Sequence, residues 1–324
     1  MSRKYNWGIL GAGRIAAKFS KGLKLLPNAN LYSVGSRNIE RAKEFAKENG
    51  YQKSFGSYEE FLSDPDLDIV YVATPHSHHK EHALLCFKHN KAVICEKALA
   101  MNTEEVEEMI AEATRRKIFL MEALWPPFQP MYKKAVEVLE KGEIGEIVYI
   151  NSRFGFKPSY DATDRKFNPE LGGGALLDIG IYPVMDTLRF MGLPQEIQAI
   201  ATFAETGVED SICVIFKYNG NKMAALYSSF LTNTGTGTDI FCTNGSINIK
   251  RVPDGSQYIA IEMGGRKKET FLFAPEFKGY HYEAAEVMKC LDEGLAESKV
   301  VPLSFSRGLI KTLDKIRDIA AIKY

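Results

Sequence analysis

Two charged residues, Glu96 and Lys97, follow directly on an apolar run in the segment VICEKALA. An adjacent acid and base in a loop usually form a solvated ion pair. The alternative is a charged pair at the carboxyl end of a parallel strand, where open α/β sheets place their active sites. Further along, Asp178 and Tyr182 are four residues apart in GGGALLDIGIYP, so a helix there would carry both on one face. A lysine, a carboxylate and a phenol are all groups that can move a proton.

A glycine-rich turn lies near the start of the chain. Gly11, Gly13 and Ala16 have the spacing G-x-G-x-x-G/A, with an apolar run before them and a helical pattern after them. In this context the motif indicates a dinucleotide site, because glycines let a pyrophosphate approach the first helical residues, here Arg14 and Ile15. The alternative is an ordinary glycine turn that binds no nucleotide.

The end of the second apolar run favours one nucleotide over another. An NAD site usually has Asp or Glu at this position to bind the ribose 2′-hydroxyl. Here the residues are Ser36 and Arg37, with Arg41 one helical turn further on. Guanidinium groups suit a 2′-phosphate, so we predict NADP rather than NAD. The alternative is that both arginines are surface residues paired with neighbouring glutamates.

Four histidines lie in the segment ATPHSHHKEH, where a third strand should end beside the nicotinamide half of a cofactor. His78 and His82 have the spacing of a metal-binding pair on a helix. No carboxylate or cysteine elsewhere obviously completes such a site, so we predict no metal. We expect cofactor contacts instead from Thr74, Pro75, His76 and His79.

These residues require a scaffold of alternating strands and helices in the first third of the chain. Strands are predicted at residues 5–12, 30–36, 68–75, 92–97 and 118–124, and helices at 14–26, 38–50, 77–90 and 103–117. Asn38 and Thr103 are predicted N-caps, and Gly50 is a predicted helix stop. This alternation predicts a doubly wound parallel sheet of the Rossmann type.

The pattern changes after residue 124. Helices are predicted at 131–142 and about 175–191 and a strand at 146–156, and the chain becomes strand-rich after Pro194. Turn signals at residues 219–220, 244–245 and 254–255 indicate a mainly antiparallel sheet. Helices at 280–294 and 305–322 close the chain. We therefore predict a Rossmann domain over 1–124 and an α+β domain over 125–324; whether the last helix packs back on the first domain stays open.

Composition excludes several classes of protein. The 324 residues include 41 basic and 41 acidic side chains, which argues against a nucleic acid or anionic membrane partner. No run of eighteen apolar residues occurs, and the first strand leaves no room for a signal peptide. Five scattered cysteines without a C-x-x-C pair favour reduced thiols in the cytoplasm over disulfides or zinc.

Four blocks in order resemble the glucose–fructose oxidoreductase / inositol dehydrogenase (Gfo/Idh/MocA) family: the glycine turn, ATPHSHH, Glu96-Lys97 and GGGALLDIGIYP. They extend over about residues 6 to 190. Within the family, MEALWPPFQP and ELGGGALLDIGIYP look closest to the dimeric dihydrodiol dehydrogenase branch, which also oxidises D-xylose with NADP. The resemblance implies a nicotinamide cofactor between two domains, and often an oligomer through the outer face of the second sheet.

The resemblance also assigns roles. The family's catalytic lysine corresponds to Lys97, but Ala98 replaces the proline of the usual Glu-Lys-Pro motif, and a proline would have stiffened the turn. Many members carry histidine where this chain has Tyr182, which favours a tyrosine in proton transfer. A nearby Lys97 ammonium would lower the tyrosine pKa from about 10, and Asp178 could orient the substrate; Lys97 could equally transfer the proton itself. We assign Glu96 to cofactor binding beside Lys97.

A substrate pocket with aromatic walls is expected. Trp125 follows the fifth predicted strand, Phe154 lies near the end of the next one, and Arg165 precedes the glycine triplet. Together with Asp178 and Tyr182 they form the predicted substrate site for a sugar, a polyol or a cyclic diol. Two other functions stay open: a non-catalytic nucleotide-sensing regulator on this fold, and an NAD-dependent polyol dehydrogenase of the inositol type.

Overall fold

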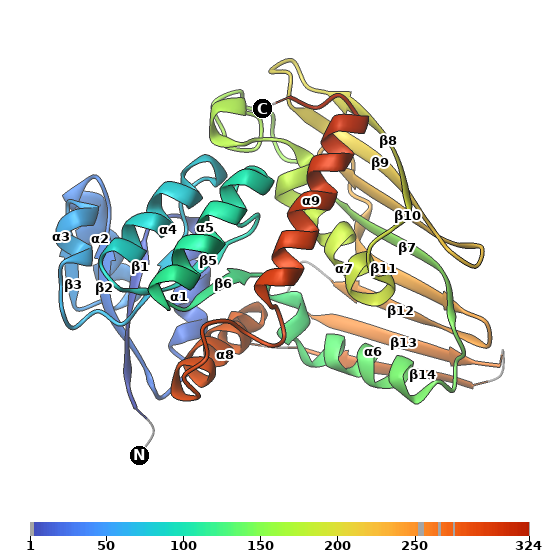
Figure 1. Cartoon of the computed structure of the whole chain (residues 1–324), viewed down its shortest axis with the longest axis horizontal. Helices are drawn as coiled ribbons and strands as arrows, with labels where there is room; N and C mark the ends of the chain where they lie inside the picture. The colour runs from blue at the N-terminus through green and yellow to red at the C-terminus, as the bar shows by residue number, and fades with distance from the viewer. Residues whose placement is uncertain (1–2, 252–255, 265–266, 275, 324) are drawn as a thin grey trace. The chain divides into compact units, whose positions relative to one another are not determined.

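The computed structural model describes residues 3–251, 256–264, 267–274 and 276–323. The chain divides into two compact units, Met1–Phe128 with Glu276–Arg307 and Gln129–Pro275 with Gly308–Tyr324 (Figure 1). The turn predicted at residues 254–255 lies outside the described part. The domain boundary predicted after residue 124 stays a prediction.

The first unit contains a six-stranded parallel sheet in the order β3-β2-β1-β4-β5-β6. This is the Rossmann order, so the predicted doubly wound sheet is confirmed. One short strand was not predicted, because its three residues are too few to show a pattern. The strands are β1 (Tyr5–Leu10), β2 (Ala29–Gly35), β3 (Lys53–Phe55), β4 (Ile69–Val72), β5 (Ala92–Glu96) and β6 (Leu120–Ala123).

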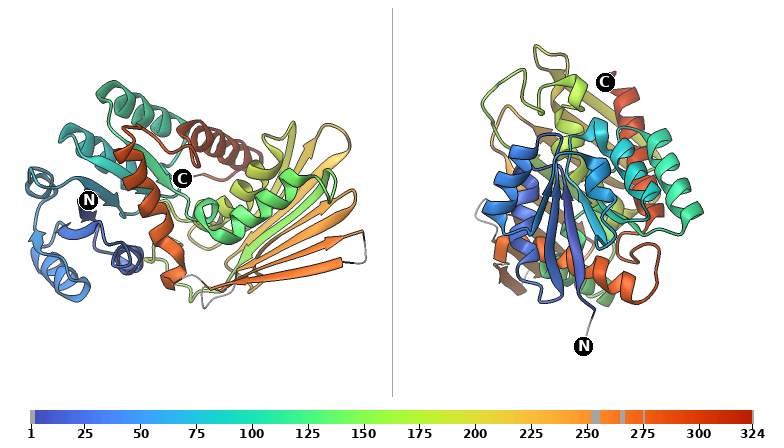
Figure 2. Two further views of the ribbon diagram at one scale, coloured as in Figure 1. Left: turned by 90° about the horizontal axis from the view of Figure 1, so that it is seen from below. Right: turned by 90° about the vertical axis from the view of Figure 1, so that its left-hand side faces the viewer.

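Helices cover both faces of this sheet, as Figure 2 (right) shows. Asn38 caps α2 by accepting from the Arg41 N–H, and Gly50 ends it in the left-handed conformation, as predicted. The predicted N-cap Thr103 is wrong by one residue: the Asn102 side chain accepts from the Glu105 N–H, and Thr103 is the first helical residue. The helices are α1 (Arg14–Leu23), α2 (Ile39–Asn49), α3 (Tyr58–Leu62), α4 (His79–Lys88), α5 (Thr103–Arg116) and α8 (Tyr280–Asp292), with short 3₁₀ turns at His76–His78, Pro126–Phe128 and Glu276–Gly279.

The core of this unit is aromatic as well as aliphatic. β4, β5 and β6 are buried along their whole length, as strands covered on both faces should be. The rings of Phe19 and Tyr71 stack with centroids 3.9 Å apart, and Trp7 packs on Phe19 at 5.7 Å. The rigid sheet therefore fixes the residues that follow the carboxyl ends of its strands.

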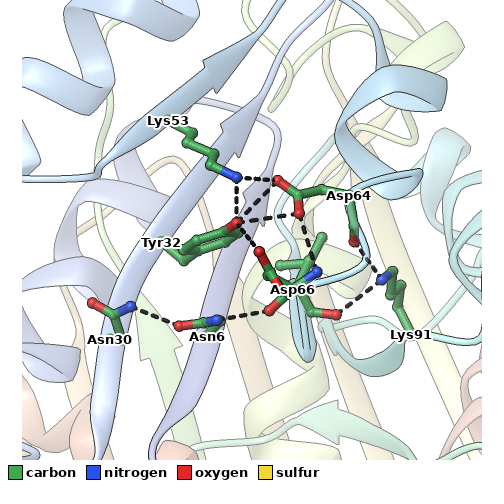
Figure 3. A network of polar contacts seen from close by, with 8 residues as sticks. Asn6, Asn30, Tyr32, Lys53, Asp64, Asp66 and Lys91 are labelled. Atoms are coloured by element: carbon green, nitrogen blue, oxygen red, sulfur yellow. Dashed lines mark hydrogen bonds and ion pairs between the residues drawn. The ribbon is translucent and has the colours of Figure 1, made fainter.

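A polar network holds the opposite, amino end of the strands (Figure 3). Asp64 pairs with Lys53 at 2.8 Å and accepts from the Tyr32 hydroxyl. Lys91 donates to the carbonyl oxygens of Asp64 and Leu67 at 2.7 and 2.9 Å, so it closes the loop before β4. The network lies at the end of the sheet away from the glycine turn, where it stabilises the fold.

The second unit contains an eight-stranded sheet in the order β14-β13-β12-β11-β7-β10-β9-β8. Only the pair β7–β10 is parallel, which confirms the mainly antiparallel sheet. The strands are β7 (Ile147–Gly155), β8 (Glu196–Phe203), β9 (Glu209–Tyr218), β10 (Lys222–Ser229), β11 (Gly235–Cys242), β12 (Gly245–Arg251), β13 (Gln257–Met263) and β14 (Lys267–Phe273).

Helices α6 (Pro130–Lys141) and α7 (Ile181–Met191) lie on one face of this sheet (Figure 1). A buried ion pair anchors α7: Asp186 accepts from Arg251 at 3.1 Å and from the Thr238 hydroxyl at 2.5 Å. Helix α9 (Leu303–Ile319) begins in the first unit and continues in the second. In the described part of the chain, none of the helices is long and apolar enough to cross a membrane.

Candidate functional site

The glycine turn has the geometry that a dinucleotide site needs. Gly11 has φ +103°, and a Cβ there would lie 2.9 Å from the Thr74 methyl group and 3.0 Å from the Ala73 carbonyl. Gly13 precedes α1 in an extended conformation and provides no side-chain cap. Backbone N–H groups at such a helix start bind phosphate, so these residues fit a pyrophosphate.

Ser36, Arg37 and Arg41 lie where the adenosine end of a dinucleotide is expected. Ser36 is buried, both arginines are exposed, and Arg41 Nε donates to the Ala12 carbonyl at 3.1 Å, which ties α2 to the glycine turn. Sequence reasoning missed Tyr58, which lies close to both arginines. Burial raises the pKa of Tyr58, and the positive charges of Arg37 and Arg41 act to lower it. A phenol and two guanidiniums therefore gather at this end of the sheet.

The histidines after β4 bind backbone and side-chain oxygens. His79 is fully buried between two carbonyl oxygens, with Nδ1 2.8 Å from Ala98 and Nε2 2.8 Å from Thr74. Burial lowers the pKa of His79 to about 4, so the neutral ring donates to one carbonyl at a time. His82 lies 3.0 Å from the Thr74 hydroxyl. No group of three or more potential metal ligands occurs among the described residues.

The turn that carries Lys97 is held from several sides. His76 donates through Nε2 to the Lys97 carbonyl at 3.1 Å, and His79 contacts the carbonyl of Ala98, whose peptide bond with Lys97 is cis. The Leu99 N–H donates to the Glu122 carboxylate at 3.0 Å. Lys97 and Leu99 thus each have a hydrogen bond to a side chain outside the turn, and Ala98 has one when the His79 proton is on Nδ1, although the proline usual in this motif is absent.

Glu96 is the last residue of β5 and is buried, as is Lys97, which excludes the solvated loop pair. The Tyr71 hydroxyl donates to the Glu96 carboxylate. Glu283 on α8 is fully buried nearby, and its burial together with the Glu96 charge raises its pKa well above the usual value. Sequence reasoning missed Tyr71, Glu122 and Glu283, because their partners are distant in sequence.

In the second unit, Asp178 and Tyr182 lie on adjoining helical segments. Asp178 is in a π-helical turn, Leu176–Gly180, and Tyr182 is in the first turn of α7. Both terminal nitrogens of Arg165 donate to Asp178 Oδ1 at 3.0 Å. The ring of Phe154 lies 5.6 Å from that of Tyr182. Four of the predicted substrate residues are thus brought together, and π turns of this kind are frequent at functional sites.

A buried carboxylate fixes the start of this helical segment. Glu209 Oε1 accepts from the Leu176 N–H at 2.7 Å, and Glu209 is fully buried. Gly174 has φ +118°, and a Cβ there would lie 2.3 and 2.5 Å from the two oxygens of Glu209. Glycine at position 174 therefore allows the backbone to lie close to the Glu209 carboxylate. Sequence reasoning did not single out Glu209.

Aromatic side chains surround these polar groups. Phe156, Phe167 and Phe230 pack with Phe154 in one cluster of the second unit. Trp125, the fifth predicted substrate residue, belongs to the first unit and packs on Tyr280 with ring centroids 5.9 Å apart.

Sequence comparison decides the family. Residues 5–124 match an oxidoreductase family with an NAD-binding Rossmann fold, and residues 132–248 match the GFO/IDH/MocA C-terminal domain. The chain is 36% identical over 331 residues to trans-1,2-dihydrobenzene-1,2-diol dehydrogenase of Xenopus laevis, with 98% of each chain covered. It is 34% identical to the Homo sapiens enzyme of that name, covering 98% of this chain and 97% of that one. The chain belongs to the Gfo/Idh/MocA oxidoreductase family.

Solved structures agree with the Gfo/Idh/MocA fold. Levoglucosan dehydrogenase, in complex with NADH and L-sorbose, matches with a TM-score of 0.88 at 19% identity, covering 98% of this chain and 97% of that one. A 3-ketoreductase from Actinomadura kijaniata, in complex with NADP and TDP-benzene, matches with a TM-score of 0.87 at 23% identity and 98% coverage of both chains. At these identities the likeness concerns the fold.

Membership of the Gfo/Idh/MocA family confirms three predictions made from the residues. The protein is an enzyme, it is an NAD(P)-binding oxidoreductase, and its first domain has the Rossmann fold. The two family matches include the glycine turn with Lys97 and the segment with Asp178 and Tyr182, respectively.

Proposed function

We propose that this Gfo/Idh/MocA enzyme transfers a hydride between NADP and the carbinol or carbonyl carbon of a sugar or a cyclic diol. The observation that carries the proposal is the buried, hydrogen-bonded turn that presents Lys97 after β5, on the same sheet edge as the glycine turn. The full-length similarity to enzymes named dihydrodiol dehydrogenases supports the substrate class.

The chain's own residues handle binding and the proton. When the alcohol is oxidised, the carbinol C–H leaves as hydride and the hydroxyl loses its proton to the deprotonated form of Tyr182 or of Lys97. The nicotinamide is the hydride carrier. Asp178, with Oδ1 held by Arg165, orients the substrate hydroxyl. Trp125 and Phe154 offer aromatic faces to the substrate.

The cofactor is held along the edge of the first sheet. The N–H groups of Arg14 and Ile15 follow Gly13 at the start of α1, where a pyrophosphate is bound. Thr74, Pro75, His76 and Glu96 contribute at the ends of β4 and β5, and the buried His79 contributes indirectly through its contacts with the carbonyl oxygens of Thr74 and Ala98. Arg37, Arg41 and the Ser36 hydroxyl face a 2′-phosphate, and no carboxylate at the end of β2 repels it.

The test is a dehydrogenase assay of aldoses, polyols and trans-dihydrodiols, with NADP and with NAD. We expect turnover with NADP on a sugar or a diol. In the variant Arg37→Gln, which leaves the Arg41 contact with Ala12 in place, affinity for NADPH should fall roughly 10- to 100-fold through lost charge-assisted hydrogen bonds, while the affinity for NADH measured by calorimetry changes little. Equal affinity for both cofactors in the wild type would contradict the NADP assignment, and silence across the panel would contradict the substrate class.

A second copy of the chain is proposed to cover the open face of the second sheet. Ile200, Met223 and Phe241 are 76%, 45% and 44% exposed, and the strand register places all three on the face away from the buried Ile212 and Ile240. Exposed apolar clusters on a sheet face mark interfaces. We expect a dimer or larger homo-oligomer by light scattering, reduced to a monomer by Ile200→Asp; a monomeric wild type at micromolar concentration would contradict this.

A further inference from the structure

Glu122 is a buried acid directly under the turn that carries Lys97. It lies on β6 opposite Cys95, one position before the partner of Glu96, and only 2% of it is exposed. Its Oε1 accepts the Leu99 N–H at 3.0 Å. The carboxylate thus supports the backbone two residues beyond Lys97 from inside the first unit.

The hydrogen bond between Glu122 and Leu99 matters for this turn because residue 98 is alanine and not proline. Ala98 lacks the ring that would fix φ, so the turn depends on its hydrogen bonds. The two histidine contacts reach the carbonyl oxygens of Lys97 and Ala98. Glu122 provides the acceptor for the following N–H, and a buried N–H without an acceptor is costly. Glutamine at this position would reach the Leu99 N–H without a negative charge, and aspartate would carry the charge on a side chain one methylene shorter.

We propose that Glu122 is a positioning residue for Lys97. Glu122 holds the turn through Leu99, and the reactivity of Lys97 depends on whether Glu122 is ionised. The inference rests on the proposed role of Lys97. Glu122 contacts the peptide backbone and acts through the turn, so it is assigned no direct contact with the substrate.

The groups around Glu122 explain why it can ionise near neutral pH. Burial raises its pKa to about 7, while Ser306 on α9, the Leu99 N–H and the positive charge of Lys97 act to lower it, and the negative charge of Glu96 acts to raise it. The Cys95 thiol also faces it, and burial keeps that thiol neutral by raising its pKa. Ser306 Oγ and Glu122 Oε2 are buried without a hydrogen bond of normal geometry among the described residues, so Ser306 acts as a nearby dipole.

The ionised form of Glu122 is the better acceptor for the Leu99 N–H, because charge-assisted hydrogen bonds are stronger. Above about pH 7 the turn is therefore held firmly and an anion lies near the Lys97 side chain. Below that pH the contact weakens and the anion is lost. The pH profile of kcat/KM should contain one step that belongs to Glu122, beside those of the groups that transfer the proton.

The experiment measures kcat/KM against pH for the wild type, Glu122→Gln and Ser306→Ala, with NADP and the best substrate of the panel. Glu122→Gln keeps an acceptor for Leu99 but no charge; we expect loss of the step near pH 7, roughly 10-fold lower kcat above pH 8, and NADPH affinity within about 2-fold of the wild type. Ser306→Ala should move the step to higher pH. Glu48→Gln, on the exposed face of α2, is the control and should leave the profile unchanged.

The ionisation of Glu122 can also be measured without turnover. Infrared difference spectra between the wild type and Glu122→Gln should show a protonated carboxyl that disappears as pH rises through about 7. An unchanged profile in both variants, or no such band, would overturn the proposal. Failure of the proposed function would look different, because Lys97→Met would then keep its activity. Failure of the positioning role alone would leave Lys97→Met inactive while Glu122→Gln behaves like the wild type.

Discussion

Replacing Lys97 by methionine should lower kcat by roughly 10²- to 10⁴-fold, the range supplied by a positioned acid or base, while NADPH binds with nearly unchanged affinity. Methionine keeps an unbranched apolar stem of four heavy atoms, with sulfur in place of one methylene, and lacks the ammonium group. The contacts that shape the turn reach its carbonyl and N–H groups, through His76, His79 and Glu122. The turn should therefore keep its conformation in the variant.

The measurement is steady-state turnover with NADP, combined with calorimetric binding of NADPH. Lys88→Met is the matched control, because Lys88 is an exposed lysine in the last turn of α4. It should retain full activity. Activity of the Lys97 variant within a few-fold of the wild type would end the assignment of Lys97 to the chemistry. Loss of NADPH binding would instead make Lys97 a cofactor ligand.

Local patterns were sufficient to predict most of the first sheet. Apolar runs bounded by helix signals gave five of its six strands, because strands buried on both faces are continuously apolar. β3 has only three residues and begins with an exposed lysine, so it depends on pairing with β2. The cap at Asn102 was missed in favour of Thr103 because both residue types cap helices well. The backbone angles at that point decide between them.

The candidate site likewise contains residues that the sequence predicts and residues that it does not. Lys97, Asp178 and Tyr182 stand out in the sequence because each lies beside a strand end or a glycine-rich turn. Glu122 and Glu209 do not, because the backbone N–H that each accepts is distant in the sequence, and the charge that acts on Glu283 is that of Glu96, which is also distant. The histidines show a further limit: His78 and His82 have the spacing of a metal pair, but a periodicity cannot show that His79 lies between two carbonyl oxygens. Tertiary contacts supply that information.

Substitution of Gly174 by alanine should destabilise the second unit strongly. The Cβ would lie 2.3 and 2.5 Å from the two oxygens of Glu209, which is fully buried and already accepts from Leu176. The backbone at φ +118° is also strained for any residue with a Cβ. Strain and overlap each cost roughly 1–3 kcal/mol, so we expect the free energy of unfolding to fall by about 4 kcal/mol.

Gly207→Ala separates the two causes. Gly207 also has a positive φ, +85°, but nothing lies within 4 Å of its Cβ position. It should lose only about 1 kcal/mol from the conformational term, as measured by urea denaturation of both variants. A Gly174→Ala protein as stable as Gly207→Ala would show that Glu209 moves aside at little cost.

Activity adds a second measurement to this comparison. Glu209 fixes the start of the helical segment that carries Asp178 and Tyr182, and a displacement of about 1 Å at a catalytic group can cost roughly 100-fold in rate. We expect the folded fraction of Gly174→Ala to turn over at least about 10-fold more slowly than the wild type, with NADPH affinity unchanged. Gly207→Ala should turn over normally. Equal rates per folded molecule in both variants would mean that Glu209 supports the fold but does not position Asp178 and Tyr182.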